Sequence, residues 1–231
     1  MWPYMVWMLL VVSWLIFRGK GEIPTRGGRT RLAAEIRGAQ GESDVAAVLH
    51  SLLNEMCGND FVLRHSVILN IAPGTKYPTA EIDHLAITPF GIFVIETKAW
   101  RGQIAPGHSD DSLLWISPAG VTELRKSPLA QNRSKVTFIR NLIPDDLLAV
   151  VNVGVFSSRH ARFSPNMPLN IIGIGDIRHW FCLQLQSWRG MTTNFALPKF
   201  VDVAKLDRTI MKFADTSPGA ASRHKERIIT D

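Results

Sequence analysis

The chain has 231 residues, of which 46% are hydrophobic and 20% charged. This composition is typical of folded domains, and it excludes a disordered chain, a collagen and a polytopic membrane protein. The formal net charge of +6 favours a nucleic-acid partner at first sight. However, residues 18–37 carry six basic and two acidic side chains, a local net charge of +4, which leaves only +2 for residues 38–231.

The first 17 residues form an uncharged apolar run, MWPYMVWMLLVVSWLIF. As a helix, at about 1.5 Å per residue, this run spans roughly 25 Å, the low end of what a bilayer core requires. A secretory signal is the alternative, but no basic residue precedes the run and no small-residue cleavage site follows it. We therefore predict a single transmembrane anchor over residues 1–17 and a basic linker over residues 18–37. Because the basic residues follow the anchor, the domain after them is expected in the cytoplasm, held at the inner (cytoplasmic) membrane.

A helix and three strands are predicted after the linker. From Gly38 on, apolar residues recur at helical spacing, which predicts an amphipathic helix packed on a core. Runs rich in β-branched and aromatic residues predict strands over residues 61–71, 80–88 and 91–98, with a tight turn between the last two. The third run is apolar at every position from Ile92 to Ile95, as expected of a central strand covered on both faces.

The second half of the chain predicts a hairpin, then helices and strands. Residues 113–117 and 121–124 flank Pro118-Ala119-Gly120, and Pro128 begins a second helix. Further strands are predicted over 147–156 and 169–174, and helices over 176–188 and 198–213. The predicted fold class is α/β, a mixed sheet flanked by helices, with one domain over residues 38–215 that ends in a helical extension. The polar residues 216–231 are expected to form a flexible tail.

Three charged residues lie on the two strands that flank the tight turn. Glu96 and Lys98 are two positions apart and so share one face of their strand, and pairing through the turn makes Asp83 a cross-strand or diagonal neighbour of Glu96. Two carboxylates at this range raise each other's pKa unless a cation lies between them. Oxygen ligands select a hard ion, Mg²⁺ or Mn²⁺, and a metal-activated water beside a lysine is suited to phosphodiester hydrolysis. The simpler interpretation is an exposed ion pair of Glu96 and Lys98 with little consequence.

For other polar residues, the evidence of a catalytic or metal-binding role is weaker. Glu42 on the first helix is a candidate third carboxylate, or it merely complements the helix dipole. The histidines lack the spacing of a metal motif, and His84 alternates onto the strand face opposite Asp83, which favours surface or supporting roles. Cys57 and Cys182 lie far apart without zinc-ligand spacing, as expected of buried thiols in a reducing compartment.

The sequence motifs that contain these residues resemble those of a known protein family. The motifs are Gly41-Glu42 ahead of a helix, Ile82-Asp83-His84, the block from Pro89 to Ile104, and Lys126-x-Pro128-Leu129-x-Gln131. Over residues 38–156 they closely resemble the nuclease-related domain (NERD) family of the PD-(D/E)xK nuclease superfamily, which has a restriction-endonuclease-like fold. Two positions depart from the pattern, because Ile82 replaces the proline of the superfamily's name and Ser127 stands where Asn is expected.

The resemblance implies a role for each matched residue. Asp83 and Glu96 would be metal ligands and Lys98 the catalytic lysine. Glu42 would be the helix acid, and Gln131 with Lys135 one turn later would be the polar pair that related nucleases place beside the site.

These observations lead to one leading hypothesis and two alternatives. The leading one is a membrane-anchored deoxyribonuclease that uses Mg²⁺ (or Mn²⁺) to hydrolyse phosphodiester bonds of DNA, with RNA not excluded as a substrate. The first alternative is a non-catalytic module, tethered to the membrane, that binds nucleic acid or a partner; the second is a purely structural anchor protein. The sequence leaves the oligomeric state open.

Overall fold

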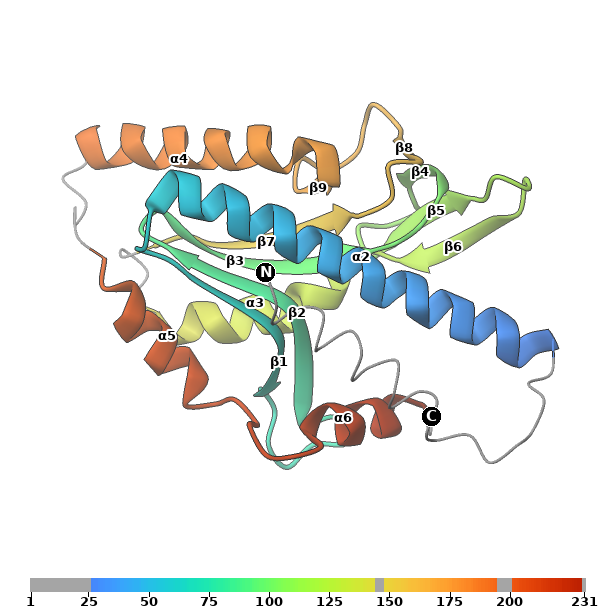
Figure 1. Ribbon diagram of the computed structural model, residues 1–231, viewed down its shortest axis with the longest axis horizontal. Helices are drawn as coiled ribbons and strands as arrows, with labels where there is room; N and C mark the ends of the chain where they lie inside the picture. Colours follow the sequence, from blue (N-terminus) through green and yellow to red (C-terminus); the bar gives the residue numbers. More distant parts are fainter. Residues whose placement is uncertain (1–25, 144–147, 195–200, 230–231) are drawn as a thin grey trace. The chain divides into compact units, whose positions relative to one another are not determined.

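The computed structural model describes residues 26–143, 148–194 and 201–229 (Figure 1). The predicted anchor, residues 1–17, lies outside this part of the chain. Among the described helices, none is long and apolar enough to cross a membrane. By its internal contacts the chain divides into residues 1–37 and residues 38–231, and the description below concerns the second unit.

The described elements follow one another in the order helix, six strands, helix, three strands and three helices, with a short 3₁₀ turn before the last three. Their bounds are α2 Arg26–Cys57, β1 Val62–Asn70, β2 Thr79–Thr88, β3 Gly91–Lys98, β4 Gly102–Pro106, β5 Ser112–Ile116, β6 Thr122–Lys126, α3 Pro128–Leu142, β7 Val150–Phe156, β8 Ala161–Phe163, β9 Ile171–Gly173, η1 Ile174–Asp176, α4 Ile177–Asn194, α5 Val203–Met211 and α6 Ala220–Ile229.

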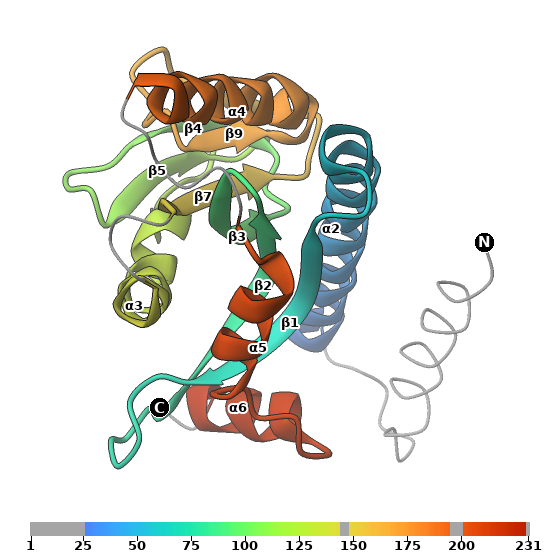
Figure 2. The same cartoon turned by 90° about the vertical axis from the view of Figure 1, so that its left-hand side faces the viewer.

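The main sheet has five strands in the order β1-β2-β3-β7-β9, antiparallel from β1 to β3 and parallel from β3 to β9. Helices α2 and α4 pack on one face, and α3 and α5 on the other (Figure 2). Side chains of β3 alternate between the two layers, because Phe93 and Ile95 contact α2 and α4, whereas Ile92 and Val94 contact α3 and α5. The α/β class, the mixed sheet and the central position of β3 are therefore confirmed.

A second sheet, which the sequence does not predict, has four strands in the order β6-β5-β4-β8. The predicted hairpin forms β5 and β6, and the extra strands β4 and β8 pair beside it. These added strands have only five and three residues, too few for an alternation pattern to stand out in the sequence.

The two segments expected to form a basic linker and a flexible tail both contain helix. The linker predicted over residues 18–37 is helical from Arg26 on. Its apolar residues Leu32 and Ile36 are exposed, so they do not form the buried stripe from which a helix is recognised in a sequence. The flexible tail predicted over residues 216–231 contains α6. Among residues 220–227 of this helix, whose burial the structure describes, only Ala220 and His224 are buried, and two residues four positions apart are too short a pattern to distinguish from a polar tail.

Gly154 on β7 allows α3 to approach the sheet closely. It pairs with Glu96 of β3, and a Cβ atom built at Gly154 would lie 2.5 Å from Cγ of Pro128, the first residue of α3. The start of α3 therefore rests directly on the backbone beside Glu96, which sets where the side chains of the next helical turns lie.

A methyl group at Gly154 is expected to cost stability. Because the neighbour is a rigid proline ring, Gly154→Ala should lower the free energy of unfolding by about 1–3 kcal/mol, measured by chemical denaturation. Gly190→Ala in α4 is the matched control, since no atom lies within 4 Å of its added Cβ; this change should raise stability by about 0.5–1 kcal/mol. Equal stabilities for the two variants would contradict the close approach of α3.

Candidate functional site

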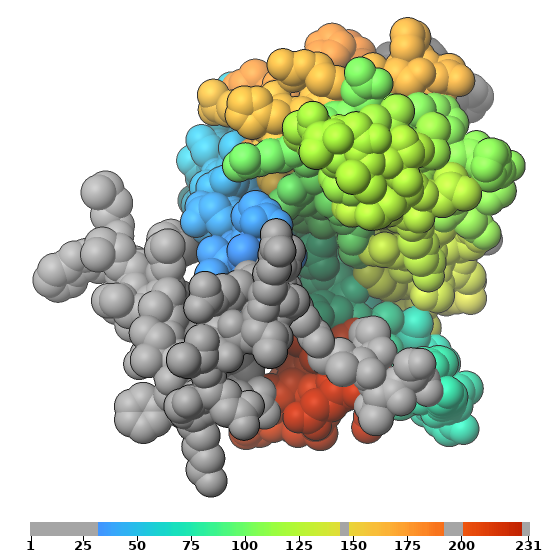
Figure 3. Space-filling view, turned by 90° about the vertical axis from the view of Figure 1, so that its right-hand side faces the viewer, coloured from blue at the N-terminus to red at the C-terminus, as the bar shows by residue number. Residues whose placement is uncertain are grey.

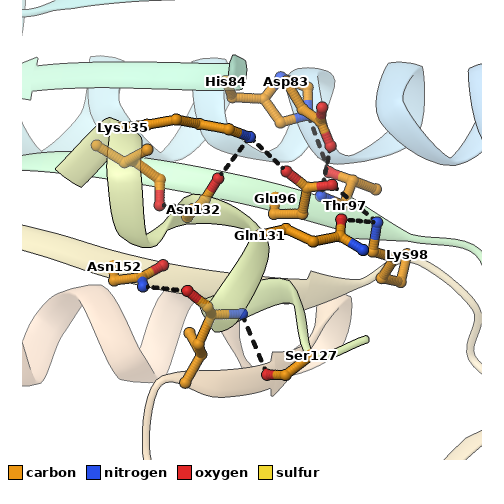
Figure 4. A network of polar contacts seen from close by, with 12 residues as sticks. Asp83, His84, Glu96, Thr97, Lys98, Ser127, Gln131, Asn132, Lys135 and Asn152 are labelled. Atoms are coloured by element: carbon orange, nitrogen blue, oxygen red, sulfur yellow. Dashed lines mark hydrogen bonds and ion pairs between the residues drawn. The ribbon is translucent and has the colours of Figure 1, made fainter. Parts of the chain in front are cut away.

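The structure brings together five of the six residues that the sequence singles out. Figure 4 shows Asp83 on β2, Glu96 and Lys98 on β3, and Gln131 and Lys135 on α3 around a single network of polar contacts. They meet at the C-terminal end of β3, after the last of its apolar residues that pack beneath α3.

Glu96 is at the centre of this network because it continues the alternation of β3. Ile92 and Val94 face the core beneath α3, so Glu96 faces the same helix and is only 7% exposed. Its Oε1 accepts a hydrogen bond from Nζ of Lys98 at 2.8 Å, and its Oε2 accepts one from Nζ of Lys135 at 2.9 Å. Burial of a charge requires such partners, and here one carboxylate lies between two ammonium groups.

Asp83 lies where the pairing of β2 with β3 ends. The last paired residues are His84 and Ile95, and the same register would place Asp83 opposite Glu96. There the Asp83 side chain replaces a strand partner, because its Oδ2 accepts a hydrogen bond from the backbone N–H of Thr97 at 2.7 Å. No residue in the described part of the chain donates to its Oδ1.

The two carboxylates have opposite pKa shifts. Burial, together with the negative charge of Glu96, raises the pKa of Asp83 to about 7. Burial also acts to raise the pKa of Glu96, but the ammonium groups of Lys135 and Lys98 outweigh it, so this pKa lies below its usual value. Neighbouring acids with separated pKa values are typical of catalytic and metal-binding sites.

The raised pKa of Asp83 has a consequence for stability in the absence of metal ions. Between pH 4 and 7 the folded protein keeps a proton on Asp83 that the unfolded chain has lost, so this residue destabilises the fold increasingly as the pH rises. Asp83→Asn removes the titration but keeps an oxygen for Thr97. Its stability advantage over the wild type should grow by up to about 1.4 kcal/mol per pH unit in this range and level off above pH 7. Urea denaturation in EDTA at several pH values measures this, and a difference independent of pH would contradict it.

Helix α3 places three polar residues of about one turn, Gln131, Asn132 and Lys135, against β3. Gln131 Oε1 accepts a hydrogen bond from Nζ of Lys98 at 2.7 Å, and Lys135 also donates to Asn132 Oδ1 at 2.9 Å. Asn132 is fully buried and donates to the carbonyl oxygen of Val94 at 3.0 Å, which ties the helix to the strand. Sequence reasoning missed Asn132; its spacing of three residues from Lys135 is the one indication that the two side chains meet.

Ser127, which stands where Asn is expected, caps the start of α3. Its Oγ accepts a hydrogen bond from the backbone N–H of Leu129 at the start of α3. Serine is among the preferred residues at this position of a helix. The departure therefore leaves α3, and with it Gln131, held in place.

Glu42 lies near the site but outside its hydrogen-bond network. Gly41 lets α2 approach the strand ends, since a Cβ there would collide with the side chain of Ser157. Burial, and then the charge of Glu81, raise the pKa of Glu42, whereas Lys225 lowers it. Glu81 on β2 is thus a further acid of this region that the sequence analysis did not single out.

On the opposite side of Asp83, two histidines support the strand ends. His84 is 2% exposed, and its Nε2 lies 3.1 Å from Oγ1 of Thr97, while His65 Nδ1 lies 2.8 Å from His84 Nδ1. Because Thr97 also donates its backbone N–H to Asp83, this chain of contacts fixes the strand position that holds the carboxylate.

The carboxylates of Asp83 and Glu96 are suited to a metal ion that keeps most of its bound water molecules. Within the described ranges, no group of three or more His, Cys, Asp or Glu side chains is arranged to hold a metal ion. Asp83 and Glu96 together supply two carboxylates, and Mg²⁺ is usually bound by one or two carboxylates while retaining several waters. The free Oδ1 of Asp83 and its raised pKa indicate a carboxylate that lacks a cation partner.

Comparison with known proteins gives a family match. Residues 37–157 match the family model described as the nuclease-related domain, NERD. This range includes all six residues that the sequence singles out, whereas α4, α5 and α6 lie beyond it. Neither a curated protein nor a solved structure matches the chain.

Proposed function

The chain belongs to the nuclease-related domain (NERD) family, and from this premise we propose that it is a nuclease that uses Mg²⁺ or Mn²⁺ to hydrolyse phosphodiester bonds of DNA. One observation carries the proposal. The buried carboxylate of Glu96 and the partly buried carboxylate of Asp83 meet a partly exposed lysine, Lys98, where β2 and β3 stop pairing. A non-catalytic binding module gains nothing from burying these charges, since burial costs free energy without adding contacts to a partner.

Asp83 and Glu96 are the residues that would hold the ion. Once bound, it would offset the repulsion between the two carboxylates and supply an activated water at neutral pH. Glu96 would hold the ion with a carboxylate that now accepts from Lys98 and Lys135, and Asp83 would hold it in its ionised form, which its pKa of about 7 makes available at and above neutral pH.

Lys98 and Lys135 differ in the part they can take. An ammonium group has three donors, and Lys98 uses two, on Glu96 and Gln131, which leaves one for a phosphate oxygen or a water. Its side chain is 16% exposed, against 8% for Lys135. We therefore propose that Lys98 stabilises negative charge on the substrate. Lys135, on α3, instead holds the carboxylate of Glu96 in position.

Cleavage of DNA by the full-length chain tests the proposal. A linear duplex and a supercoiled plasmid are incubated with the protein in Mg²⁺, in Mn²⁺ and in EDTA. The proposal expects nicked or shortened DNA with either ion and intact DNA in EDTA. DNA that is bound but stays intact with both ions would instead support the non-catalytic module.

We also propose that residues 1–17 hold the protein at the inner (cytoplasmic) membrane, with the nuclease-related domain in the cytoplasm. The support is the uncharged apolar run followed by basic residues. Cell fractionation tests this: the full-length chain should sediment with membranes and resist alkaline extraction, whereas a chain that starts at residue 18 should not. Recovery of the full-length chain in the supernatant would overturn the proposal.

A further inference from the structure

Helix α6 lies outside the family match but is fixed to β2, the strand that carries Asp83, and to its neighbour β1. The segment before it pairs with β1, because the N–H of Asp215 donates to Ile68 O at 2.8 Å and the N–H of Asn70 donates to Phe213 O at 2.9 Å. Within α6, the buried His224 holds the helix to β2 through a 2.9 Å hydrogen bond between its Nδ1 and Oγ1 of Thr79. Figure 1 shows α6 across the ends of these two strands.

The attachment point places α6 beside the acids of the site. Thr79, Glu81 and Asp83 alternate along β2, so their side chains share one face of the strand. The hydrogen bond of His224 to Thr79 therefore places α6 against the start of this face. In Figure 3, α6 (red), the light-blue part of α2 and the β5–β6 hairpin (yellow-green) border a hollow in which β2 (teal) is visible.

Lys225 of α6 is a cation that can bind a ligand at this hollow. It follows His224 directly, it is exposed, and its positive charge acts on Glu42 of α2. It makes no hydrogen bond or ion pair with any residue that the structure describes. Arg223, by contrast, is held by Asp215 and by the carbonyl oxygen of Pro218.

A DNA strand that reaches Asp83 and Glu96 passes several carboxylates, which repel its phosphates. A cation beside them offsets this repulsion and fixes the path of the backbone. Resting on the nuclease function proposed above, we propose that Lys225 binds a backbone phosphate of the DNA as it enters the site along the face of β2 that carries Thr79, Glu81 and Asp83. Helix α6 is then part of the DNA-binding surface, although the family match does not include it.

Binding of a fluorescent DNA duplex to the full-length chain tests this inference, with Ca²⁺ in place of Mg²⁺ and at several salt concentrations. Lys225→Ala should raise Kd about 3–10-fold and reduce the slope of log Kd against log salt by about 1, the value for one lost phosphate contact. Lys225→Arg should restore both. Lys205→Ala on α5 is the matched control, because it removes an equal charge from another exposed helix position and should leave Kd and slope unchanged.

Two results would overturn the inference: Lys225→Ala with the Kd and salt slope of the wild type, or an equal loss in Lys205→Ala. Cleavage of DNA by the wild type in Mg²⁺ is measured in a separate experiment, so that the two proposals can fail independently. If the wild type cleaves DNA and Lys225→Ala binds it normally, only the role of α6 fails. If Lys225→Ala weakens binding but the wild type never cleaves, only the nuclease proposal fails.

Discussion

Glu96→Gln is expected to lower the Mg²⁺-dependent cleavage of DNA by at least about 10³-fold, because it removes a metal ligand and the anion that organises both lysines. It should also lower the free energy of unfolding by about 3–5 kcal/mol, since the ammonium groups of Lys98 and Lys135 then face each other without a counter-charge. Initial rates of plasmid nicking and urea denaturation measure the two effects.

A double variant shows whether the loss of cleavage activity is caused by the loss of the metal ligand or by the loss of stability. Glu96→Gln combined with Lys135→Met removes the buried pair as a whole, which is usually far less costly than removing one partner. The double variant should regain most of the lost stability and remain inactive. Glu123→Gln, which breaks an exposed ion pair with Arg125 on β6, is the control that should change neither quantity. A double variant that regains both stability and activity would contradict the assignment of Glu96.

Lys98→Met is expected to reduce cleavage by about 10²–10⁴-fold while leaving the fold intact. Glu96 keeps Lys135 as a partner in this variant, so the free energy of unfolding should change by less than about 1 kcal/mol. Because the lysine competes with a cation for Glu96, the variant should bind Mn²⁺ more tightly than the wild type, although it cleaves poorly. Tighter binding with lost activity is the result that a merely structural lysine would not produce.

The comparison for Lys98 is Arg133→Met on the exposed side of α3, where the guanidinium pairs with Asp111. This variant should keep the activity, stability and Mn²⁺ affinity of the wild type. If Lys98→Met cleaves DNA at more than a tenth of the wild-type rate, Lys98 has no role in charge stabilisation.

The part of the site formed by Asp83, Glu96 and Lys98 was predictable because it depends on local geometry. A tight turn joins two strands, side chains alternate, and apolar residues from Ile92 on show which face is covered. These rules place the carboxylates at one strand end without knowledge of the rest of the fold.

The remaining contacts depend on tertiary packing that no local pattern records. Lys135 reaches Glu96 from 39 residues away, and His224 reaches Thr79 from 145 residues away. The close approach of Pro128 to Gly154 depends on how α3 crosses the sheet, and only the folded backbone shows it. Helix α6 was missed because two buried residues in a basic, polar stretch do not form an amphipathic pattern.

The central claim is that Asp83 and Glu96 share a divalent cation, and Mn²⁺ binding to the full-length chain tests it most directly. Electron paramagnetic resonance at pH 8, where Asp83 is ionised, counts free and bound Mn²⁺ during a titration. We predict one bound Mn²⁺ per wild-type chain, displaced by excess Mg²⁺, and an affinity at least about tenfold weaker in Asp83→Asn. Equal Mn²⁺ affinity of Asp83→Asn and wild type, or no bound Mn²⁺ in either, would contradict the claim.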